Sequence, residues 1–391
     1  MTHHSPGALH IHSRFSDGTG DLDEIARAAR RAGLEWLGMT DHNTLAPTYR
    51  GFEGVHDGLV VIVGYEWTPD GGDHMLVYDE HAALGDEPLD PTLPPAEAIA
   101  ILGNRGALTH LAHPDERRGV AIPALPPYPW HDWNVRGMRG IELWNYMSEW
   151  AERLTPANRL LHVLLPGTGL QGPTDRVLRW WDALNVPVAP DQEAPAPRVP
   201  APGVPAPRAS RRRATGPPPG RPGFAGGDRL TVGVSGTDVH AFRIRALGRT
   251  LTIFPYAQVF RTFTNYLRLA EPLPADIEPA RAAILSAIAD GRLYFANRRL
   301  GDALGLELTA AGPDGREAGP GEWLAWAGGA ELRVHSPRHA ALRLLRDGTE
   351  IARGSGRSLR VEAPGPGSYR LEARRFGEPW AYTNPVVLTP P

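Results

Sequence analysis

The sequence predicts a protein of the α/β class: a larger N-terminal domain with a parallel sheet or an α/β barrel, followed by a small antiparallel β domain. In the N-terminal part, short apolar runs of strand length alternate with helical segments, as in repeated strand–helix units. After about residue 274 this alternation gives way to turn pairs that separate short alternating segments. A length of 391 residues, at about 150 per domain, is enough for two or three domains.

Helix and strand signals follow one another along the N-terminal part. Asp21 to Glu24 has the spacing of a capping box, and it opens an amphipathic helix that runs to Arg31 and is closed by Gly33. Two further segments read as helices, 95–102 and 174–184. Apolar, β-branched or aromatic runs predict strands at 9–12, 34–40, 59–65, 107–112, 140–144 and 230–234. In such a fold, functional residues are expected at the C-terminal ends of the strands.

The domain limits follow from two changes in composition. Residues 186–227 contain repeated Ala-Pro units and the run Arg211-Arg212-Arg213, and we expect a disordered or extended insertion because few apolar residues are available to offset the ordering entropy. We therefore predict one domain at 1–274, interrupted by this insertion, and a small β-sandwich at 275–391. The strands expected in the second domain include 342–344, 359–361 and 369–373, with a turn at Asp347-Gly348.

The composition excludes several kinds of chemistry. The chain has no cysteine, so disulfides, thiol catalysis and thiolate metal sites are excluded. It also has no lysine, since all 41 basic residues are arginine, which excludes Schiff bases, a Walker phosphate loop and a metal site bridged by a carboxylated lysine. A net charge of −3 gives no signal for nucleic-acid or membrane-surface binding. With no apolar run near the roughly 18 residues of a membrane span and no leader pattern, a cytoplasmic protein is expected.

Most of the fifteen histidines precede residue 132, and many of them stand at predicted strand ends beside carboxylates. His10 and His12 share one side of a strand because side chains repeat every two residues. Each such pair alone is more often structural, but independent structural histidines have no reason to recur at successive strand ends. The sequence therefore predicts a metal site built from residues at these ends: His10, His12, Asp17, His42, Glu66, His113, Glu142, Asp238 and His240.

These motifs resemble those of the polymerase-and-histidinol-phosphatase (PHP) metal-dependent phosphoesterases. The resemblance covers residues 8–240 apart from the insertion, and its order and approximate spacing match the family. It rests on His10-x-His12, Ser16-Asp17-Gly18, Thr40-Asp41-His42, Gly64-x-Glu66, Ala112-His113-Pro114 and Asp238-x-His240. The resemblance implies a distorted (β/α)7 barrel. The C-terminal part, with Gly367-Ser368-Tyr369-Arg370, Pro379-Trp380 and Asn384-Pro385, is similar to a subgroup named after carbaryl-hydrolase-like metallohydrolases, which carries a β-sandwich.

The resemblance also implies a division of ligands among two or three divalent Zn, Mn or Fe ions. His10, His12, Glu66 and Asp238 would hold the first ion, and Glu66 would bridge to a second ion bound by His113. The remaining ligand of the second ion is open between Glu142 and His131. Asp17, His42 and His240 would hold a third ion or contact a substrate phosphate.

Hydrolysis by a hydroxide that bridges two ions is the expected mechanism, because such a pair lowers the pKa of the shared water. Among the ligands, Glu66, Asp238 and His240 are the expected catalytic residues, while His74, His110 and Arg14 are candidates for contact with the substrate. An imidazole or the outer carboxylate Asp41 is a candidate to protonate or orient the leaving group.

Three functions remain open. The first is hydrolysis of a small-molecule phosphoester. The second is hydrolysis of a carboxylic ester or carbamate, since the same nucleophile attacks an acyl carbon. The third is a binding module that keeps its metals without catalysis.

Overall fold

The computed structural model describes residues 2–79, 87–117, 126–158, 167, 169–188, 223–225, 227, 229–246, 248–326 and 328–390. Most of the Pro- and Arg-rich segment 186–227, and with it the expected disordered insertion, lies outside the described residues. The described chain is a mixed α/β protein with one sheet of 19 strands and two small two-stranded sheets.

Parallel strands form the N-terminal part of the large sheet. In order of pairing they are β4 (Leu59–Val63), β2 (Trp36–Met39), β1 (His3–Ile11), β11 (Val232–Val239), β8 (Gly140–Asn145) and β7 (Ala107–Leu111). From β7 the pairing continues antiparallel through β6 (Met75–Asp79) to β5 (Tyr65–Trp67). Since β5 follows β4 after the single residue Gly64, the path of pairing returns to its start. We call these strands the strand ring. The short strand β3 (Gly54–His56) is antiparallel to β4.

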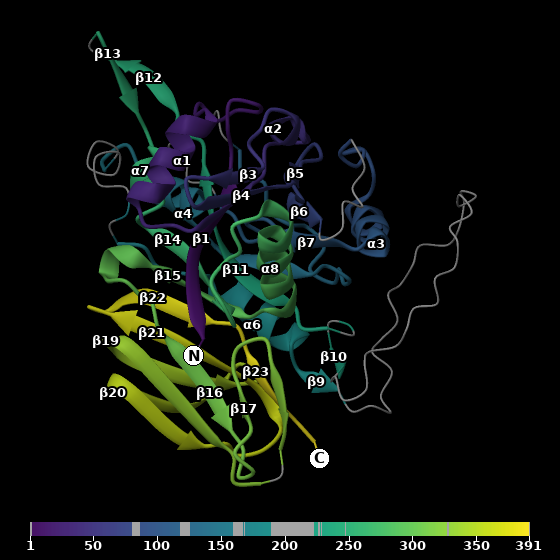
Figure 1. Ribbon diagram of the computed structural model, residues 1–391, viewed down its shortest axis with the longest axis vertical. Coiled ribbons are helices and arrows are strands. Elements are labelled where there is room, and N and C mark those ends of the chain that lie inside the picture. The colour runs from purple at the N-terminus through teal and green to yellow at the C-terminus, as the bar shows by residue number, and fades with distance from the viewer. Residues whose placement is uncertain are drawn as a thin grey trace, which may run out of the picture.

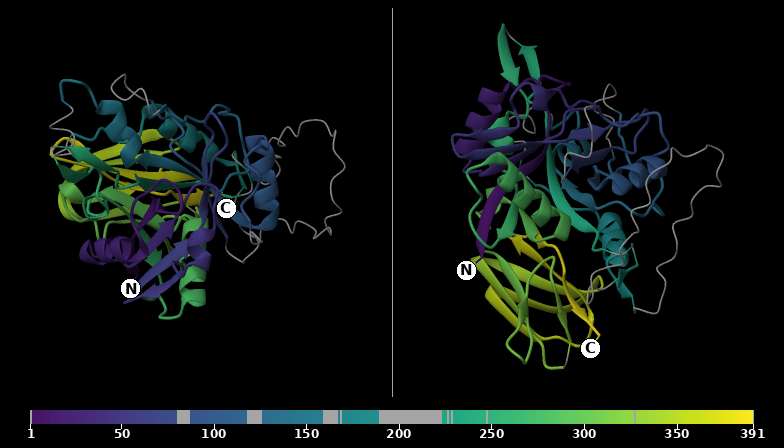
Figure 2. Two further views of the ribbon diagram at one scale, coloured as in Figure 1. Left: turned by 90° about the horizontal axis from the view of Figure 1, so that it is seen from above. Right: turned by 45° about the vertical axis from the view of Figure 1, so that its right-hand side comes forward.

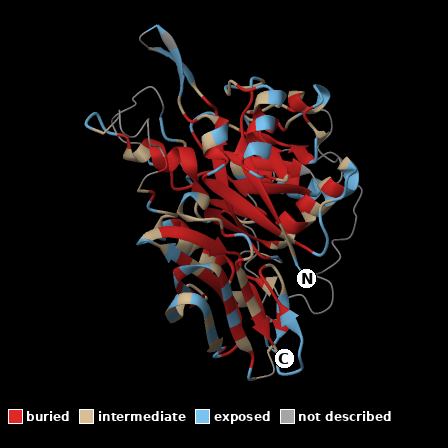
Figure 3. Ribbon diagram, turned by 60° about the vertical axis from the view of Figure 1, so that its left-hand side comes forward, coloured by how far each residue is buried: buried red, intermediate tan, exposed pale blue. Residues whose placement is uncertain are grey.

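The ring strands are buried on both faces, which explains their nearly continuous apolar runs. One face, with Leu9, Ile62 and Tyr78, packs against α8 (Ile277–Asp290). The other face belongs to a core that also includes residues of α1 (Leu22–Arg31), α3 (Pro95–Arg105), α4 (Tyr146–Arg153), α6 (Asp175–Leu184) and α7 (Tyr256–Val259). Figure 3 shows the resulting block of buried strands. The remaining helical turns are α2 (Ala46–Tyr49) and the 3-10 turn η1 (Arg298–Leu300).

The capping signals read from the sequence have their structural counterparts. The side chain of Asp21 accepts a hydrogen bond from the N–H of Glu24 at 2.9 Å, so α1 begins where the capping box places it. Helix α3 includes the predicted segment 95–102, and α6 begins at Asp175, one residue after the start of the predicted segment 174–184. The strand β6 was not among the predicted strands, and its omission affects the functional site, as described below.

The large sheet continues from the ring into the C-terminal strands. β14 (Phe263–Leu269) is antiparallel to β1, β15 (Leu293–Asn297) to β14, and β22 (Glu378–Thr383) to β15. The other C-terminal strands are β16 (Glu307–Ala311), β17 (Glu317–Ala318), β18 (Trp323–Ala325), β19 (Glu331–Arg346), β20 (Thr349–Glu362), β21 (Gly367–Arg375) and β23 (Val386–Thr389). These strands share a core of their own, whereas the apolar face of α8 packs with the ring, although α8 lies beyond residue 274.

The two ends of the molecule carry different elements. The C-terminal strands lie beside the start of β1, and the hairpin of β12 (Arg243–Ala246) and β13 (Arg249–Thr252) projects at the opposite end (Figure 1). The rotated view on the right of Figure 2 shows the same arrangement. β9 (Pro187–Val188) and β10 (Gly223–Phe224) form a short pair beside α6 in Figure 1. None of the helices in the described part of the chain combines the length and apolar character needed to cross a membrane.

Candidate metal centre

Imidazoles and carboxylates from distant parts of the sequence meet at the C-terminal ends of the ring strands. Four groups of side chains each bring their ligand atoms within 4.8 Å of one another. The groups are His12–Asp17–His42–His240, His10–His12–Glu66, His10–His113–Asp238 and Glu66–His74–His113. Asp238 and His240 therefore lie together with His10 and His12, as convergence of parallel strand ends requires.

The backbone at three of these residues is in the left-handed region, where non-glycine residues are rarely found. The φ angles are +62° at His10, +30° at His113 and +52° at Asp238. A register shift between Leu9 and Ile11 accompanies the unusual conformation of His10. Such conformations cost of order 1–3 kcal/mol each and persist where the surrounding structure imposes them, commonly at functional sites.

Glu66 is shared between two sets of histidines. Its Oε2 lies 3.3 Å from Nε2 of His10 and 3.4 Å from Nε2 of His12. Its Oε1 lies 3.0 Å from Nδ1 of His74 and 3.3 Å from Nε2 of His113. Because the carboxylate is 1% exposed, its two oxygens have these imidazoles as neighbours rather than water. A carboxylate placed in this way can bridge two cations.

Glu66 and Asp238 each lie at a metal-ligand separation from both His10 and His12. Oδ1 of Asp238 is 3.5 Å from Nε2 of His10 and 3.4 Å from Nε2 of His12. Together with the distances to Glu66, these values match the roughly 3.4 Å expected between ligands that each lie about 2.1 Å from a tetrahedral zinc ion. Nε2 of both histidines is buried without a hydrogen-bond partner among the described residues, and Oε2 of Glu66 also lies 3.0 Å from Nδ1 of His42. Buried polar atoms without partners are costly, so a cation is the natural partner of this set.

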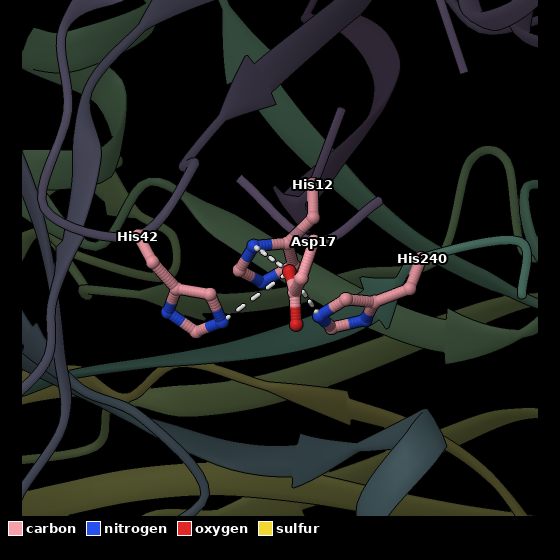
Figure 4. Close-up of side chains that lie close together, drawn as sticks. All are labelled: His12, Asp17, His42 and His240. Carbon is pink, nitrogen blue, oxygen red and sulfur yellow. Dashed lines mark ion pairs between the residues drawn. The ribbon is translucent and has the colours of Figure 1, made fainter. Parts of the chain in front are cut away.

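His12 also belongs to the group around Asp17, which is drawn in Figure 4. Oδ1 of Asp17 is 3.0 Å from Nε2 of His240, 3.5 Å from Nε2 of His42 and 3.8 Å from Nδ1 of His12. The side chain of Asp17 is 53% exposed, in contrast to the buried Glu66 and Asp238. This group is therefore the part of the centre that solvent reaches most readily.

His74 lies where the remaining ligand of the second ion is needed, a position for which the sequence predicted other residues. The sequence left the remaining ligand of the second ion open between Glu142 and His131, and neither belongs to any of the four groups. His131 is exposed and pairs with Asp73 at 3.0 Å. His74, expected as a substrate contact, instead groups with Glu66 and His113. The sequence signal that would have found it is the apolar run of β6, because a strand at 75–79 puts His74 at a strand end.

Glu142 holds two of the candidate ligands, His10 and His113, through hydrogen bonds. Its Oε1 lies 2.9 Å from Nδ1 of His10, and its Oε2 accepts hydrogen bonds from the backbone N–H of His113 and from Nδ2 of Asn145, both at 2.8 Å. Both oxygens are thus occupied in holding two candidate ligands. A carboxylate at Nδ1 of a histidine fixes the proton there and directs the Nε2 lone pair toward a cation.

Asp41 is likewise a supporting residue. Its carboxylate accepts hydrogen bonds from the backbone N–H and hydroxyl groups of Ser13 and Ser16, at 2.7–3.1 Å. The residue is fully buried, so it holds the loop that leads to Asp17. The expected role of Asp41 at the leaving group is not favoured by this geometry, because its oxygens already have four donors.

Two other candidate substrate contacts lie apart from the four groups. His110 is 1% exposed, and a Cβ on Gly140 would lie 2.3 Å from its ring. Burial, with Arg139 nearby, lowers the pKa of His110 to about 3, so the ring is neutral. Arg14 is exposed, with its guanidinium 5.7 Å from the ring of Phe15. The structure therefore places His110 in the packed interior, and Arg14 at the surface a few residues from Asp17.

The carboxylates and imidazoles of the centre shift one another's pKa values toward the charged forms. Burial lowers the pKa of His10, but the neighbouring carboxylates outweigh it and hold the pKa well above its usual value. In the same way, the pKa of His42 is raised to about 10 and that of His113 to about 9. Burial would raise the pKa of Glu66 and Asp238, but the imidazoles hold both well below the usual range. Binding of a divalent cation would therefore displace protons from these histidines.

A small cavity of about 50 Å³ adjoins the centre on the side of His113. Its lining includes Asn145 and the carboxylates of Glu149 and Glu152. Burial raises the pKa of Glu152 to about 7, and the nearby carboxylates act in the same direction. Glu149 accepts a hydrogen bond from Nε1 of Trp144 at 2.6 Å. Its side chain is therefore held by the protein.

Comparisons with known proteins give one family match and one structural similarity. The family model of the PHP domain matches residues 8–87, which include His10, His12, Asp17, His42, Glu66 and His74. No curated protein matches the chain. The chain is similar to a crystal structure from Bacteroides vulgatus, described as a two-domain protein containing a predicted PHP-like metal-dependent phosphoesterase. That similarity has a TM-score of 0.42 and 13% sequence identity, and it covers 98% of this chain and 95% of the other.

Proposed function

We propose that this protein is a metal-dependent phosphoesterase of the PHP type, with two or three divalent ions at the ends of the ring strands. The observation that carries the proposal is the placement of Glu66. One oxygen of this buried carboxylate faces His10 and His12, while the other faces His74 and His113. A carboxylate shared between two nitrogen-rich sets would hold two cations close together, as a two-metal hydrolase needs.

The same proposal extends to the fold. We interpret the strand ring as the distorted (β/α)7 barrel of the PHP family and the C-terminal strands beyond β14 as a β-sandwich, with the division near residue 274. The closed path of pairing supports the barrel, and the separate core of the C-terminal strands supports the sandwich. The carbaryl-hydrolase-like subgroup remains part of this proposal.

The proposed division of ligands among the ions combines the layout that the resemblance implies for the first ion with the observed groups for the others. His10, His12, Glu66 and Asp238 would hold the first ion, and Glu66, His74 and His113 the second. Asp17, His42 and His240 would hold a third ion or contact the substrate phosphate. Nitrogen and oxygen donors without thiolates suit Zn, Mn or Fe.

When bound, the cations supply Lewis acidity and lower the pKa of a shared water toward neutrality. The side chains of the protein provide negative charge around the cations and a site for a proton. Glu66 and Asp238 place two buried negative charges beside the reacting centre, which keeps the cations together. His240 has its Nδ1 2.9 Å from the backbone carbonyl of Asp238, so Nδ1–H donates there and Nε2 is left to bind a cation or to hold a proton beside the exposed Asp17.

The proposed substrate class is a small phosphoester, and hydrolysis of bis-p-nitrophenyl phosphate by the metal-supplemented protein is the direct test. Glu66→Gln should abolish this hydrolysis and lower the metal content, because the amide cannot bridge two cations. The matched control is Glu307→Gln, which removes a carboxylate from β16 and should leave the rate unchanged. An undiminished rate in Glu66→Gln would contradict the mechanism, and fewer than one ion per chain in the wild type would contradict the metal centre.

The same assay separates the other candidate functions. Aryl phosphomonoesters, phosphodiesters and naphthyl carbamates should be tested side by side. Hydrolysis of the carbamate alone would replace the phosphoesterase by an ester or carbamate hydrolase on the same residues. Inactivity on all three substrates with metals bound would identify a binding module.

A further inference from the structure

Among the described strands, β11 has no strand neighbour on one side of its first half. β1 pairs with β11 only at Leu9–Gly236 and Ile11–Val239, because its earlier residues, His3–Gly7, turn away to pair with β14. On its other side β11 pairs with β8 from Val232 onward. The N–H of Val232 donates to the carbonyl of Arg139 on that side. The polar backbone groups of Gly233 and Ser235 therefore point to the side that β1 has left.

Two buried asparagines take the place of the missing strand. Oδ1 of Asn384 accepts a hydrogen bond from the N–H of Gly233 at 2.7 Å, and its Nδ2 donates to the carbonyl of Gly233 at 2.8 Å. Asn265 makes the same pair of bonds to Ser235, at 3.0 and 2.8 Å. Both side chains are at most 1% exposed. Each amide thus reproduces the donor and acceptor of a neighbouring peptide group.

The second connection from the C-terminal strands reaches the same part of β11. Arg370 on β21 binds both carboxylate oxygens of Asp182 on α6, at 2.5 and 2.8 Å. The neighbouring Trp181 donates from Nε1 to the carbonyl of Thr231 at 2.7 Å. Asn185 binds both the N–H and the carbonyl of Thr231, at 2.8 and 2.9 Å. Two residues of the C-terminal motifs noted in the sequence are therefore connected to the start of β11. Asn384 binds Gly233 directly, and Arg370 holds the helix whose Trp181 bonds Thr231, the residue before β11.

We propose that the C-terminal strands are a positioning element of the metal centre, with Asn384 and Asn265 as positioning residues that set the path of β11. The far end of this strand carries Asp238 and His240. Asp238 is five residues beyond Gly233, about 16 Å along a strand. A shift of the strand by one residue would turn Asp238 away from His10 and His12, since neighbouring side chains point to opposite faces.

The need for such support follows from the order of the chain. β11 is reached from the Pro- and Arg-rich segment 186–227, whose composition provides few residues that could pack beside it. Its left-handed residue Asp238 also needs neighbours that impose the conformation. The hydrogen bonds from Asn384 and Asn265 hold the backbone of β11 in place at the end of the strand opposite Asp238. This proposal concerns metal binding and does not depend on which ester is hydrolysed.

The test compares zinc affinity, measured by competition with a chromophoric chelator, in Asn384→Ala and in the control Leu371→Ala. Leu371 is fully buried in the core of the C-terminal strands and its apolar side chain makes no hydrogen bond, so its truncation destabilises those strands without removing a bond to Gly233. We expect Asn384→Ala to weaken at least one zinc site about tenfold, while Leu371→Ala stays within twofold of the wild type. Amide hydrogen exchange at Gly233 should become faster in Asn384→Ala only.

Equal zinc affinity in Asn384→Ala and the wild type would overturn the proposal and leave the C-terminal strands with a role in stability alone. A loss of affinity in Leu371→Ala that equals the loss in Asn384→Ala would do the same. If Asn384→Ala does not fold, Asn265→Ala tests the same row of bonds from β14, with the faster exchange then expected at Ser235. Unchanged affinity in that variant would also refute the proposal. A wild-type protein that binds no zinc would contradict the proposed function instead.

Discussion

The buried carboxylate of Glu142 gives the sharpest test of how the metal centre is held. It accepts hydrogen bonds from three donors, Nδ1 of His10 and the N–H groups of His113 and Asn145. In Glu142→Gln, an amide NH2 replaces one of the two oxygens and must face at least one of these donors. We therefore expect the variant to fold but to lose control over His10 or His113.

The magnitude follows from the role of the residue. Removing a partner that orients a metal ligand typically costs 10- to 100-fold in metal affinity. That range corresponds to about 1.4–2.7 kcal/mol. Zinc titration against a chromophoric chelator measures it directly. The matched control is Glu149→Gln, another buried carboxylate, which accepts from Nε1 of Trp144 and touches no candidate ligand. Its zinc affinity should remain within twofold of the wild type.

A cobalt-substituted protein distinguishes support from direct ligation. If Glu142 acts through His10, the cobalt absorption spectrum of Glu142→Gln should keep the wild-type band positions at saturating metal. A changed spectrum would mean that Glu142 is itself a ligand, as the sequence first suggested. A variant with wild-type affinity would refute the supporting role altogether.

Three further predictions concern stability and packing. Because the pKa of Glu152 is raised from 4.5 to about 7, the folded state binds more protons than the unfolded state between these pH values, and stability falls as the pH rises through that window. In urea titrations, Glu152→Gln should therefore be more stable than the wild type at pH 8, by about 1–2 kcal/mol after discounting for exposure. The two proteins should be equally stable at pH 4. A Cβ on Gly236 would lie 1.3 Å from Oε1 of Glu142, so Gly236→Ala should weaken zinc binding, whereas Gly103→Ala in α3, with open space around it, should not. Arg370→Met leaves Asp182, whose side chain is 11% exposed, without its arginine partner, whereas Glu372 keeps Arg343. The variant should lower the free energy of unfolding by about 3–5 kcal/mol, and a loss below 1 kcal/mol would contradict this account.

The residues that the sequence could place in the centre are those that stand at the ends of recognisable strands. Period-two alternation puts His10 and His12 on one side of β1, and parallel strands bring their C-terminal ends together, so Glu66, His113 and Asp238 were expected beside them. His74 was assigned to the substrate because the strand that follows it, Met75–Asp79, was not recognised. The missed strand is antiparallel to both neighbours, and the expected alternation of strands and helices leaves no place for it.

The supporting residues could not be assigned from the sequence, because their role depends on which backbone groups lack a partner. Asn265 and Asn384 are neutral residues in an ordinary strand and loop, and only the departure of β1 from β11 gives them something to bind. Glu142 was noticed as a carboxylate near a strand end, but its role depends on the position of Nδ1 of His10. Such assignments require the register of the sheet, which a single sequence does not contain.

The centre combines features that each lower the stability of the folded chain. Glu66 and Asp238 are charged and almost fully buried, and His10, His113 and Asp238 adopt left-handed backbone conformations. These costs are offset only if neighbouring groups fix each residue in place. Glu142 does so for the two histidines, and the asparagine row along β11 does so for the strand that ends in Asp238. Because a strained residue relaxes when its support is removed, the supporting bonds rather than the ligands themselves should set how closely the site matches its cations.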